Sequence, residues 1–258
     1  MSGESPPPFE AGLVLRGIAR ALSRSGGSVA VIAIGATLLE TAILQGVQHA
    51  VGADPTAALM AGALGLFIGT IGTSFKTAAI THVVRARRKS YVPTLGESLR
   101  WALARLPTVI LTSAMTFLLM MIGFVCLVIP GLVVALSLIV ATPVAVMEEG
   151  GVMHALRRSR ELTQDRLGPI FVSNLFVSPL LFGGYFVAFA LMAVIAGEPF
   201  GTAVGHVLVP TTPVAIVLSS LAIAAMSGFT AVYAAVVYGM LTRKPRKGLG
   251  ERVARVFE

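Results

Sequence analysis

The chain of 258 residues is 55% hydrophobic and only 12% charged, about half the charged fraction that is usual in a soluble globular protein. This composition, with a mean hydropathy of +0.86, excludes an ordinary soluble fold and predicts a membrane protein. A net charge of +8 would by itself favour nucleic acid as a partner, but we expect no such partner, because the basic residues flank apolar stretches and there meet anionic lipid headgroups.

The basic residues follow a regular pattern along the chain. All but one of the 20 Lys and Arg residues lie in four segments, and the exception is Lys76. The four segments are 1–27, 85–106, 148–167 and 242–258. Because cytoplasmic loops of membrane proteins are enriched in Lys and Arg, this pattern predicts an even number of membrane crossings with both termini in the cytoplasm.

Six segments have the roughly 20 apolar residues that a membrane-spanning helix needs. They are 28–51, 57–84, 107–129, 131–147, 168–197 and 213–241. We therefore expect an all-α fold of six transmembrane helices in three hairpins. A turn at Pro130 and Gly131 separates the third span from the fourth. The alternative, one long helix, would place the later basic clusters outside, against the charge rule.

A short amphipathic segment precedes each odd-numbered span. The three segments are 14–24, 94–106 and 151–163, and apolar residues recur at helical spacing along one face of each. The second begins with Thr94 and Glu97 at the spacing of a helix capping box. We expect all three to form helices that lie along the cytoplasmic headgroup boundary.

The expected domain organisation is one membrane domain between two tails. Residues 1–8, which include three consecutive prolines, are predicted to be disordered, and no cleavable signal peptide is expected there, because no basic start precedes an apolar stretch. The membrane domain covers 9–241. Residues 242–258 form a basic cytoplasmic tail that is predicted to associate with anionic lipid.

Two ionisable residues, Glu40 and Lys76, fall inside predicted spans, where charged groups are costly and usually functional. At 1.5 Å per residue they lie about 18 Å and 12 Å from the cytoplasmic ends, so their long side chains can meet. Gly65, Gly69 and Gly72 share a helical face with Lys76 and permit close helix contact. We predict an ion pair that clamps the first hairpin; alternatively, each side chain reaches water separately.

Hydroxyl side chains mark another face of the second span. They belong to Thr70, Ser74, Thr77 and Thr81. One interpretation is a polar pathway through the membrane. The other is packing between helices, with the hydroxyl groups bonded to carbonyl groups of their own helix, as is common for Ser and Thr in membranes.

A local signature runs from the fourth span into the third amphipathic segment. It consists of Ile129-Pro130-Gly131, Ala141-Thr142-Pro143, Glu148 and Ala155-Leu156-Arg157-Arg158-Ser159-Arg160-Glu161-Leu162-Thr163. It resembles the membrane domain fused to some bacterial glycerophosphoryl diester phosphodiesterases, which also occurs alone in small multipass proteins. The resemblance covers residues 90–241 and implies a bacterial inner-membrane fold. It implies no phosphodiesterase activity, which requires a soluble barrel holding a metal with His and carboxylate ligands.

The residues of this signature are assigned first to a structural motif. Its members are Pro130, Gly131, Pro143, Glu148, Ser159 and Leu162. Pro143 is expected to kink the fourth span, and Glu148 is expected to pair with Arg157 or Arg158. The alternative is a lipid-headgroup or phosphate site formed by Arg157, Arg158 and Arg160, since the forked guanidinium group suits phosphate.

These residues bear on three classes of function: a scaffold, a transporter or channel, and an enzyme. A noncatalytic, lipid-interacting scaffold at the cytoplasmic face fits best, with anionic lipids as partners and a homo-oligomer or a membrane-protein partner as further options. The alternative is a transporter or channel for a small solute or lipid that uses Glu40 and Lys76. An enzyme is not expected, since HExxH and GxSxG motifs are missing. A single cysteine and four scattered histidines predict neither a metal site nor a cofactor.

Overall fold

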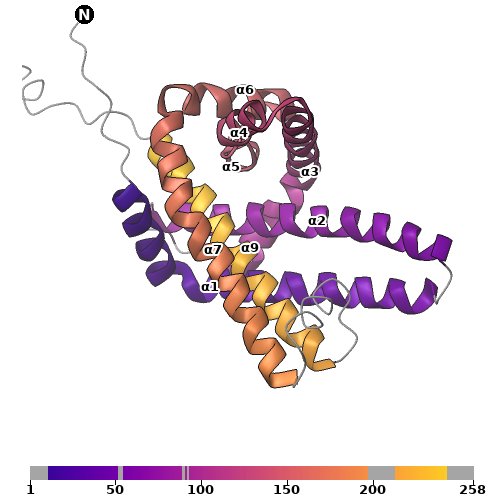
Figure 1. Ribbon diagram of the computed structural model, residues 1–258. Helices are drawn as coiled ribbons and strands as arrows, with labels where there is room; N and C mark the ends of the chain where they lie inside the picture. The colour runs from indigo at the N-terminus through magenta and orange to yellow at the C-terminus, as the bar shows by residue number, and fades with distance from the viewer. Residues whose placement is uncertain (1–10, 52–54, 89–90, 92, 197–212, 243–258) are drawn as a thin grey trace, which may run out of the picture.

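The computed structural model describes residues 11–51, 55–88, 91, 93–196 and 213–242, and all regular structure there is helical (Figure 1). The α-helices are α1 (Ala11–Val51), α2 (Pro55–Arg88), α3 (Leu95–Cys126), α4 (Val128–Ser137), α5 (Ala141–Met147), α6 (Gly151–Thr163), α7 (Leu167–Ala196) and α9 (Pro213–Leu241), with a 3-10 turn, η1 (Gln164–Arg166), before α7. The all-α prediction is confirmed for these residues. The predicted N-terminal tail, 1–8, lies outside the described residues, and so does the predicted C-terminal tail, 242–258, except for Thr242.

Four helical stretches of the described chain are long and apolar enough to cross a membrane. They are Gly12–Ala50, Leu95–Cys126, Val128–Met147 and Ile216–Leu241. The second and fifth predicted spans form α2 and α7, which are not among these four. Four candidate spans are therefore present, and the arrangement of six spans in three hairpins stays a prediction.

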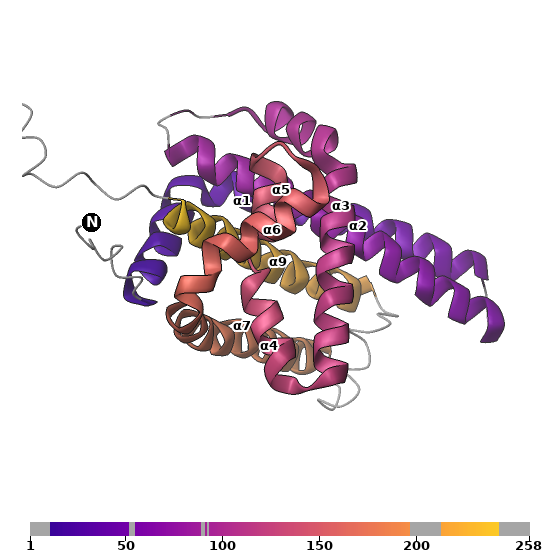
Figure 2. The same ribbon diagram turned by 90° about the horizontal axis from the view of Figure 1, so that it is seen from above.

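Two of the predicted amphipathic helices are not separate elements. The first is continuous with the first span in α1, and the second is continuous with the third span in α3. In Figure 1 the indigo start of α1 bends away from the rest, and Figure 2 shows a bend in α3. Gly26 and Gly27 lie between the joined segments of α1, and Pro107 lies inside α3, so each junction holds residues that bend helices without ending them. The third amphipathic helix is α6, with the predicted limits.

The turn between the third and fourth predicted spans lies earlier than expected. Leu127, with extended backbone angles (φ −172°, ψ 152°), is the single residue between α3 and α4. Pro130 falls in the first turn of α4, where its missing N–H leaves no hydrogen bond unmade. A Cβ atom on Gly131 would lie 2.6 Å from the Phe124 ring, and one on Gly123 would lie 2.9 Å from the Cα of Gly131. Gly131 is therefore needed for close helix packing rather than for the turn.

The fourth predicted span is a broken helix. The N–H of Ala141 donates to the carbonyl oxygen of Leu138 (3.0 Å), so it does not make the α-helical bond to Ser137. Pro143 has no N–H to offer Ile139. The chain therefore leaves α4 at Ser137 and re-enters a helix at Ala141.

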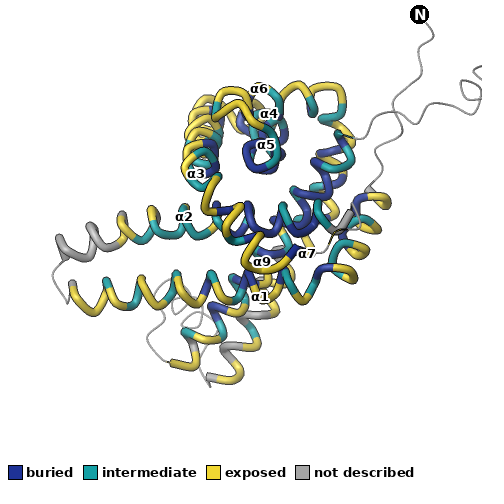
Figure 3. Tube along the Cα trace, turned by 180° about the vertical axis from the view of Figure 1, so that it is seen from behind, coloured by how far each residue is buried: buried dark blue, intermediate teal, exposed yellow. Residues whose placement is uncertain are grey.

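The protein core forms around α9, the last of the described helices. Figure 3 shows buried residues gathered around α5 and α9. The buried apolar side chains include Val14, Ile32 and Ala33 of α1, Ile80 and Val83 of α2, Val144 of α5, and Val232 and Val236 of α9. Gly17 of α1 lies so close to α9 that an added Cβ would be 2.8 Å from Val236 and 2.9 Å from Met240. The first and last helices are thus packed directly together.

The α3–α4 pair lies across the direction of α1 and α2 and keeps much of its apolar surface uncovered. Figures 1 and 2 show the steep crossing: α3 and α4 are seen nearly end-on in the view where α1 and α2 lie in the plane. Phe117 is 64% exposed and Val125 is 80% exposed. An apolar surface of this kind is typical of contact with lipid or with another membrane helix.

Candidate functional site

Charged and polar side chains gather at one end of several helices. We call Arg85, Arg105, Glu148, His154, Arg158 and Tyr238 the Glu148 network. Arg85 and Tyr238 lie in the last turns of α2 and α9, and Glu148 ends α5. His154 and Arg158 belong to α6 and Arg105 to α3, so the network joins five helices from three separate parts of the sequence: α2 with α3, α5 with α6, and α9.

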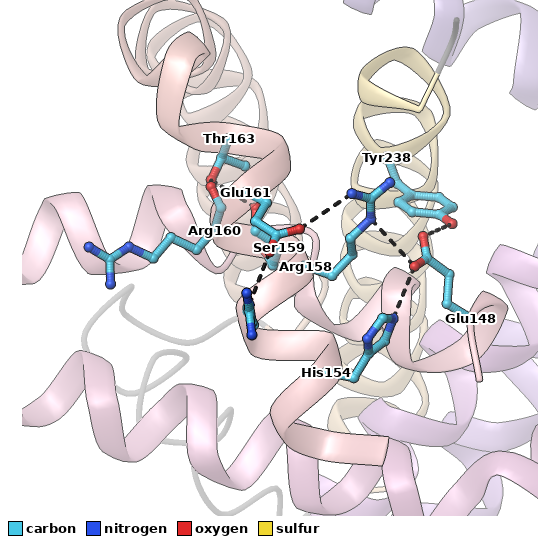
Figure 4. A network of polar contacts seen from close by, with 9 residues as sticks. Glu148, His154, Arg158, Ser159, Arg160, Glu161, Thr163 and Tyr238 are labelled. Atoms are coloured by element: carbon cyan, nitrogen blue, oxygen red, sulfur yellow. Dashed lines mark hydrogen bonds and ion pairs between the residues drawn. The ribbon is translucent and has the colours of Figure 1, made fainter. Parts of the chain in front are cut away.

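Glu148 is the centre of this network (Figure 4). The hydroxyl group of Tyr238 donates to its Oε1 at 2.9 Å. His154 Nε2 lies 3.3 Å and Arg158 Nε 3.5 Å from its Oε2. One carboxylate therefore ties α6 to the end of α9, and its side chain is 25% exposed.

Two glycines set the turn that brings α6 back to Glu148. Gly150 and Gly151 have φ angles of +150° and +74°, which side chains with a Cβ atom rarely adopt. A Cβ on Gly150 would also lie 2.5 Å from the ring of His154. The chain reverses within Glu148-Glu149-Gly150-Gly151, so that Arg158, two turns into α6, reaches the carboxylate of Glu148.

Two further arginines complete the network from α2 and α3. Arg85 places its guanidinium carbon 5.2 Å from the ring centroid of Tyr238, a cation–π geometry. Its Nη1 is buried and has no hydrogen-bond partner among the described residues. Arg105 Nη2 lies 2.9 Å from Glu149 Oε1, and its Nη1 donates to the backbone oxygen of Glu148 at 3.4 Å.

The hydroxyl groups of Ser159 and Thr163 bind the broken end of α4. Ser159 Oγ donates to the backbone oxygen of Ser137 at 2.8 Å. Thr163 Oγ1 lies 3.1 Å from the same oxygen and 2.9 Å from the backbone oxygen of Ser159, so its one proton is shared between these two acceptors. The Ser137 oxygen lost its α-helical partner where the fourth span breaks. Ser159 thus makes a specific bond in addition to permitting close approach, and Leu162 packs against the main core nearby.

The arginines of α6 do not form the predicted three-residue cluster. Arg157 Nε pairs with Glu161 Oε1 at 3.1 Å, and Arg158 bonds both Glu161 and Glu148. Arg160 points away from the Glu148 network in Figure 4. The arginines that share a site with Arg158 are Arg85 and Arg105. Arg85 and Arg105 are far from Arg158 in sequence, so no local motif predicted that they share a site. The one sequence signal was that all three lie in basic segments predicted to be cytoplasmic.

The structure brings Glu40 and Lys76 together in the interior. Lys76 Nζ lies 3.0 Å from Glu40 Oε2 and 3.2 Å from Thr37 Oγ1. The Lys76 side chain is 1% exposed and that of Glu40 is 15% exposed. Cβ atoms on Gly69 and Gly72 would lie 3.3 Å and 2.5 Å from the Glu40 carboxylate oxygens, so these glycines make the room that the carboxylate occupies.

Two members of the hydroxyl stripe of α2 lie inside the protein, and one of them bonds a neighbouring helix. Ser74 Oγ bonds Ser113 Oγ of α3 at 3.2 Å, and both Ser74 and Thr81 are buried. A hydroxyl contact of the same kind joins α1 to α9, where Thr41 bonds Ser220 at 3.1 Å. These contacts favour the packing interpretation of the stripe over a pathway.

The described residues contain no group of three or more His, Cys, Asp or Glu side chains placed to hold a metal ion. Comparisons with protein-family models, curated proteins and solved structures found no match. The resemblance to the membrane domain of glycerophosphoryl diester phosphodiesterases therefore stays a prediction. The site has to be interpreted from its own geometry.

Proposed function

We propose that this chain is a noncatalytic, lipid-interacting scaffold of the bacterial inner membrane, with six spans in three hairpins and both termini in the cytoplasm. The Glu148 network would lie at the cytoplasmic headgroup level and bind anionic lipid. The exposed apolar faces of α3 and α4 would contact lipid, a second copy of the chain or another membrane protein.

The observation that supports lipid binding most directly is the unsatisfied nitrogen of Arg85. A buried guanidinium N–H without a partner is costly, and a phosphate oxygen satisfies it well. Arg85 lies in the last turn of α2, which the charge pattern assigns to the cytoplasmic side. Anionic phospholipids place their phosphate groups at this level of the membrane.

Lipid retention tests this proposal. The protein is purified from membranes containing phosphatidylglycerol and phosphatidylcholine, and the lipids it retains are measured by native mass spectrometry. We expect selective retention of phosphatidylglycerol, reduced about tenfold in Arg85→Gln, since a charge-assisted hydrogen bond contributes about 1.5 kcal/mol or more. Arg85→Lys keeps the positive charge but loses the forked donors of the guanidinium group, so this variant should retain an intermediate amount of phosphatidylglycerol.

Arg20→Gln is the matched control, because Arg20 is an exposed arginine of α1 outside the network. It measures the loss caused by removing one headgroup-level charge, and the loss in Arg85→Gln should be several times larger. Circular dichroism melting curves verify that each variant is folded. Equal retention of both lipids by the wild type, or unchanged retention by folded Arg85→Gln, would contradict the lipid site.

The second candidate function is transport of a small solute or lipid. It is supported by the Glu40–Lys76 pair, because Glu40 keeps 15% exposure inside a candidate span and intramembrane charges often mark transport pathways. The test is flux through wild-type protein and Glu40→Gln in liposomes. A flux that depends on Glu40 would favour transport over the scaffold.

A further inference from the structure

A cavity of about 400 Å³ lies between the end of α2 and the start of α3, beside the Glu148 network. It is lined by His82, Tyr91, Glu97, Arg100, Trp101 and Ala104. Its size is within the range of small-molecule sites. Glu97 also belongs to the helix capping box of α3.

The cavity presents two opposite charges that do not neutralise each other. The carboxylate of Glu97 accepts hydrogen bonds from the Tyr91 hydroxyl group, at 2.9–3.0 Å, and from the backbone N–H of Thr94, and it has no cationic partner within the described chain. Arg100, one turn further along α3, likewise has no ion pair with a described residue. A carboxylate can accept further hydrogen bonds, so among the described residues both groups have bonding capacity left for a ligand.

The aromatic wall of the cavity is held in place. The ring of Trp101 stacks on His82 at 5.2 Å between centroids, and the guanidinium group of Arg105 lies 5.3 Å from the Trp101 ring centroid. His82 is in turn bonded to Ser98 at 3.3 Å. The Tyr91 ring is 53% exposed, so a cation can stack on it.

In the membrane orientation proposed above, the first turns of α3 place this cavity at the headgroup boundary. Ser98 and Ala102 are buried against the protein, whereas Leu95 and Leu103 form an exposed apolar face. Glu97, Arg100 and Trp101 project on the side away from those leucines, because residues three and four apart share a helical face. If the leucines contact hydrocarbon, the cavity opens toward headgroups and water.

We propose that this cavity binds a zwitterionic phosphate ester that carries an ammonium group, such as a phosphoethanolamine group. Arg100 binds the phosphate through its forked donors, and Glu97, with the Tyr91 ring, binds the ammonium group. The ligand is either the headgroup of a phospholipid or the corresponding water-soluble ester. The lipid source rests on the proposed function; the soluble source does not.

Trp101 is the only tryptophan of the chain, so intrinsic fluorescence reports directly on this cavity. Full-length protein in detergent micelles is titrated with glycerophosphoethanolamine and, separately, with glycerophosphoglycerol, which has the same phosphodiester but no ammonium group. A second arm uses nanodiscs with increasing phosphatidylethanolamine in constant phosphatidylglycerol. We expect a saturable change in at least one arm, and about tenfold weaker binding of the ester that lacks the ammonium. A response in the nanodisc arm alone identifies the lipid as the source.

Two variants test whether Glu97 binds the ammonium group and Arg100 binds the phosphate. Glu97→Gln preserves the capping box, which accepts Glu or Gln, and should lower affinity for the ethanolamine ester about tenfold while leaving the glycerol ester unchanged. Arg100→Gln should weaken both esters, and Arg20→Gln neither. The proposal is overturned by an unsaturable response in both arms, by equal affinity of the wild type for the two esters, or by folded variants that bind like wild type. Retention of phosphatidylglycerol at Arg85 is measured on the same variants, so this proposal can fail while the proposed function stands.

Discussion

At the scale of single residues, the buried ion pair shows how far sequence reasoning reaches. Glu40 and Lys76 could be matched because both lie at similar depth and Lys76 shares a face with glycines. Thr37, which also bonds Lys76, was missed, since a Thr one turn from Glu40 has no distinguishing pattern. Arg85 and Arg105 were not assigned to the site because their partners come from helices that only the tertiary fold brings near.

Breaking the buried pair should destabilise the protein strongly. Glu40→Gln leaves Lys76, only 1% exposed, without its counter-ion, a change that typically costs about 3 kcal/mol. Glu40→Gln combined with Lys76→Met removes both charges and should recover much of that loss. The free energy of unfolding in mixed micelles measures both. Glu161→Gln removes a partner from an exposed ion pair and serves as the control; it should change stability by less than about 1 kcal/mol. If the double variant is no more stable than Glu40→Gln, the lost Glu40–Lys76 ion pair is not the cause of the destabilisation.

The glycine that accommodates Glu40 can be tested separately. Gly72→Ala puts a methyl group where the Glu40 carboxylate lies, 2.5 Å from Oε2, so the carboxylate must move and we expect destabilisation of about 1–3 kcal/mol. Gly35→Ala on α1 meets nothing within 4 Å and should be neutral or stabilising by up to about 1 kcal/mol, because Ala favours helix over Gly. Thermal unfolding compares the two variants. Equal effects would argue against the tight space beside Glu40.

At the scale of elements, α6 and the capping box of α3 were predicted correctly because their signals are local. Thr94 and Glu97 make both reciprocal bonds of the box. The turn between α3 and α4 was predicted at Pro130 and Gly131, because proline and glycine are typical of turns. This position was wrong: the extended residue is Leu127, and a leucine gives no turn signal in the sequence. The break before Ala141 was only partly foreseen: Pro143 predicted a kink, but the bonds from Ser159 and Thr163 that stabilise it come from another helix.

The hydroxyl groups of Ser159 and Thr163 should be able to replace each other as hydrogen-bond donors to the Ser137 oxygen. In Thr163→Val the bond from Ser159 to the Ser137 oxygen remains, and in Ser159→Ala the Thr163 hydroxyl can turn from the backbone oxygen of residue 159 to that of Ser137. Each single change should therefore cost about 1 kcal/mol or less. The double variant leaves a buried carbonyl without either bond and should cost more than the sum of the two, by about 1 kcal/mol or more. A double-mutant cycle in unfolding free energy measures this coupling, and hydrogen exchange at 138–141 should rise chiefly in the double variant. Simple additivity would mean that the carbonyl has another partner.

At the scale of the whole molecule, the charges lie at one end of several helices and the uncovered apolar surface lies on α3 and α4. The sequence predicted this polarity well, since Lys and Arg counts need no tertiary information. It could not predict that α3 and α4 cross α1 and α2 steeply (Figure 2). Crossing angles depend on how side chains of two helices interlock, and Gly123 against Gly131 is a contact that composition does not disclose.

Sidedness has a direct test. A phosphatase reporter inserted after Leu127 should be active, because that bend is predicted to face the periplasm, whereas the same reporter after Glu149 should be inactive. A green fluorescent protein fused behind Glu258 should fluoresce, as it does only in the cytoplasm. The reverse pattern at any of these sites would require another number of crossings.

The contact between Gly17 and the end of α9 also bears on the order of assembly during synthesis. Val14, Ile18 and Ala33 of α1 are buried, and α9, the helix that Gly17 and Ala33 contact, leaves the ribosome after every other described helix. Until then the residues of α1 that pack on α9 lack this partner. Completion of the core between these two helices therefore waits for α9, whichever of the other described helices have already paired.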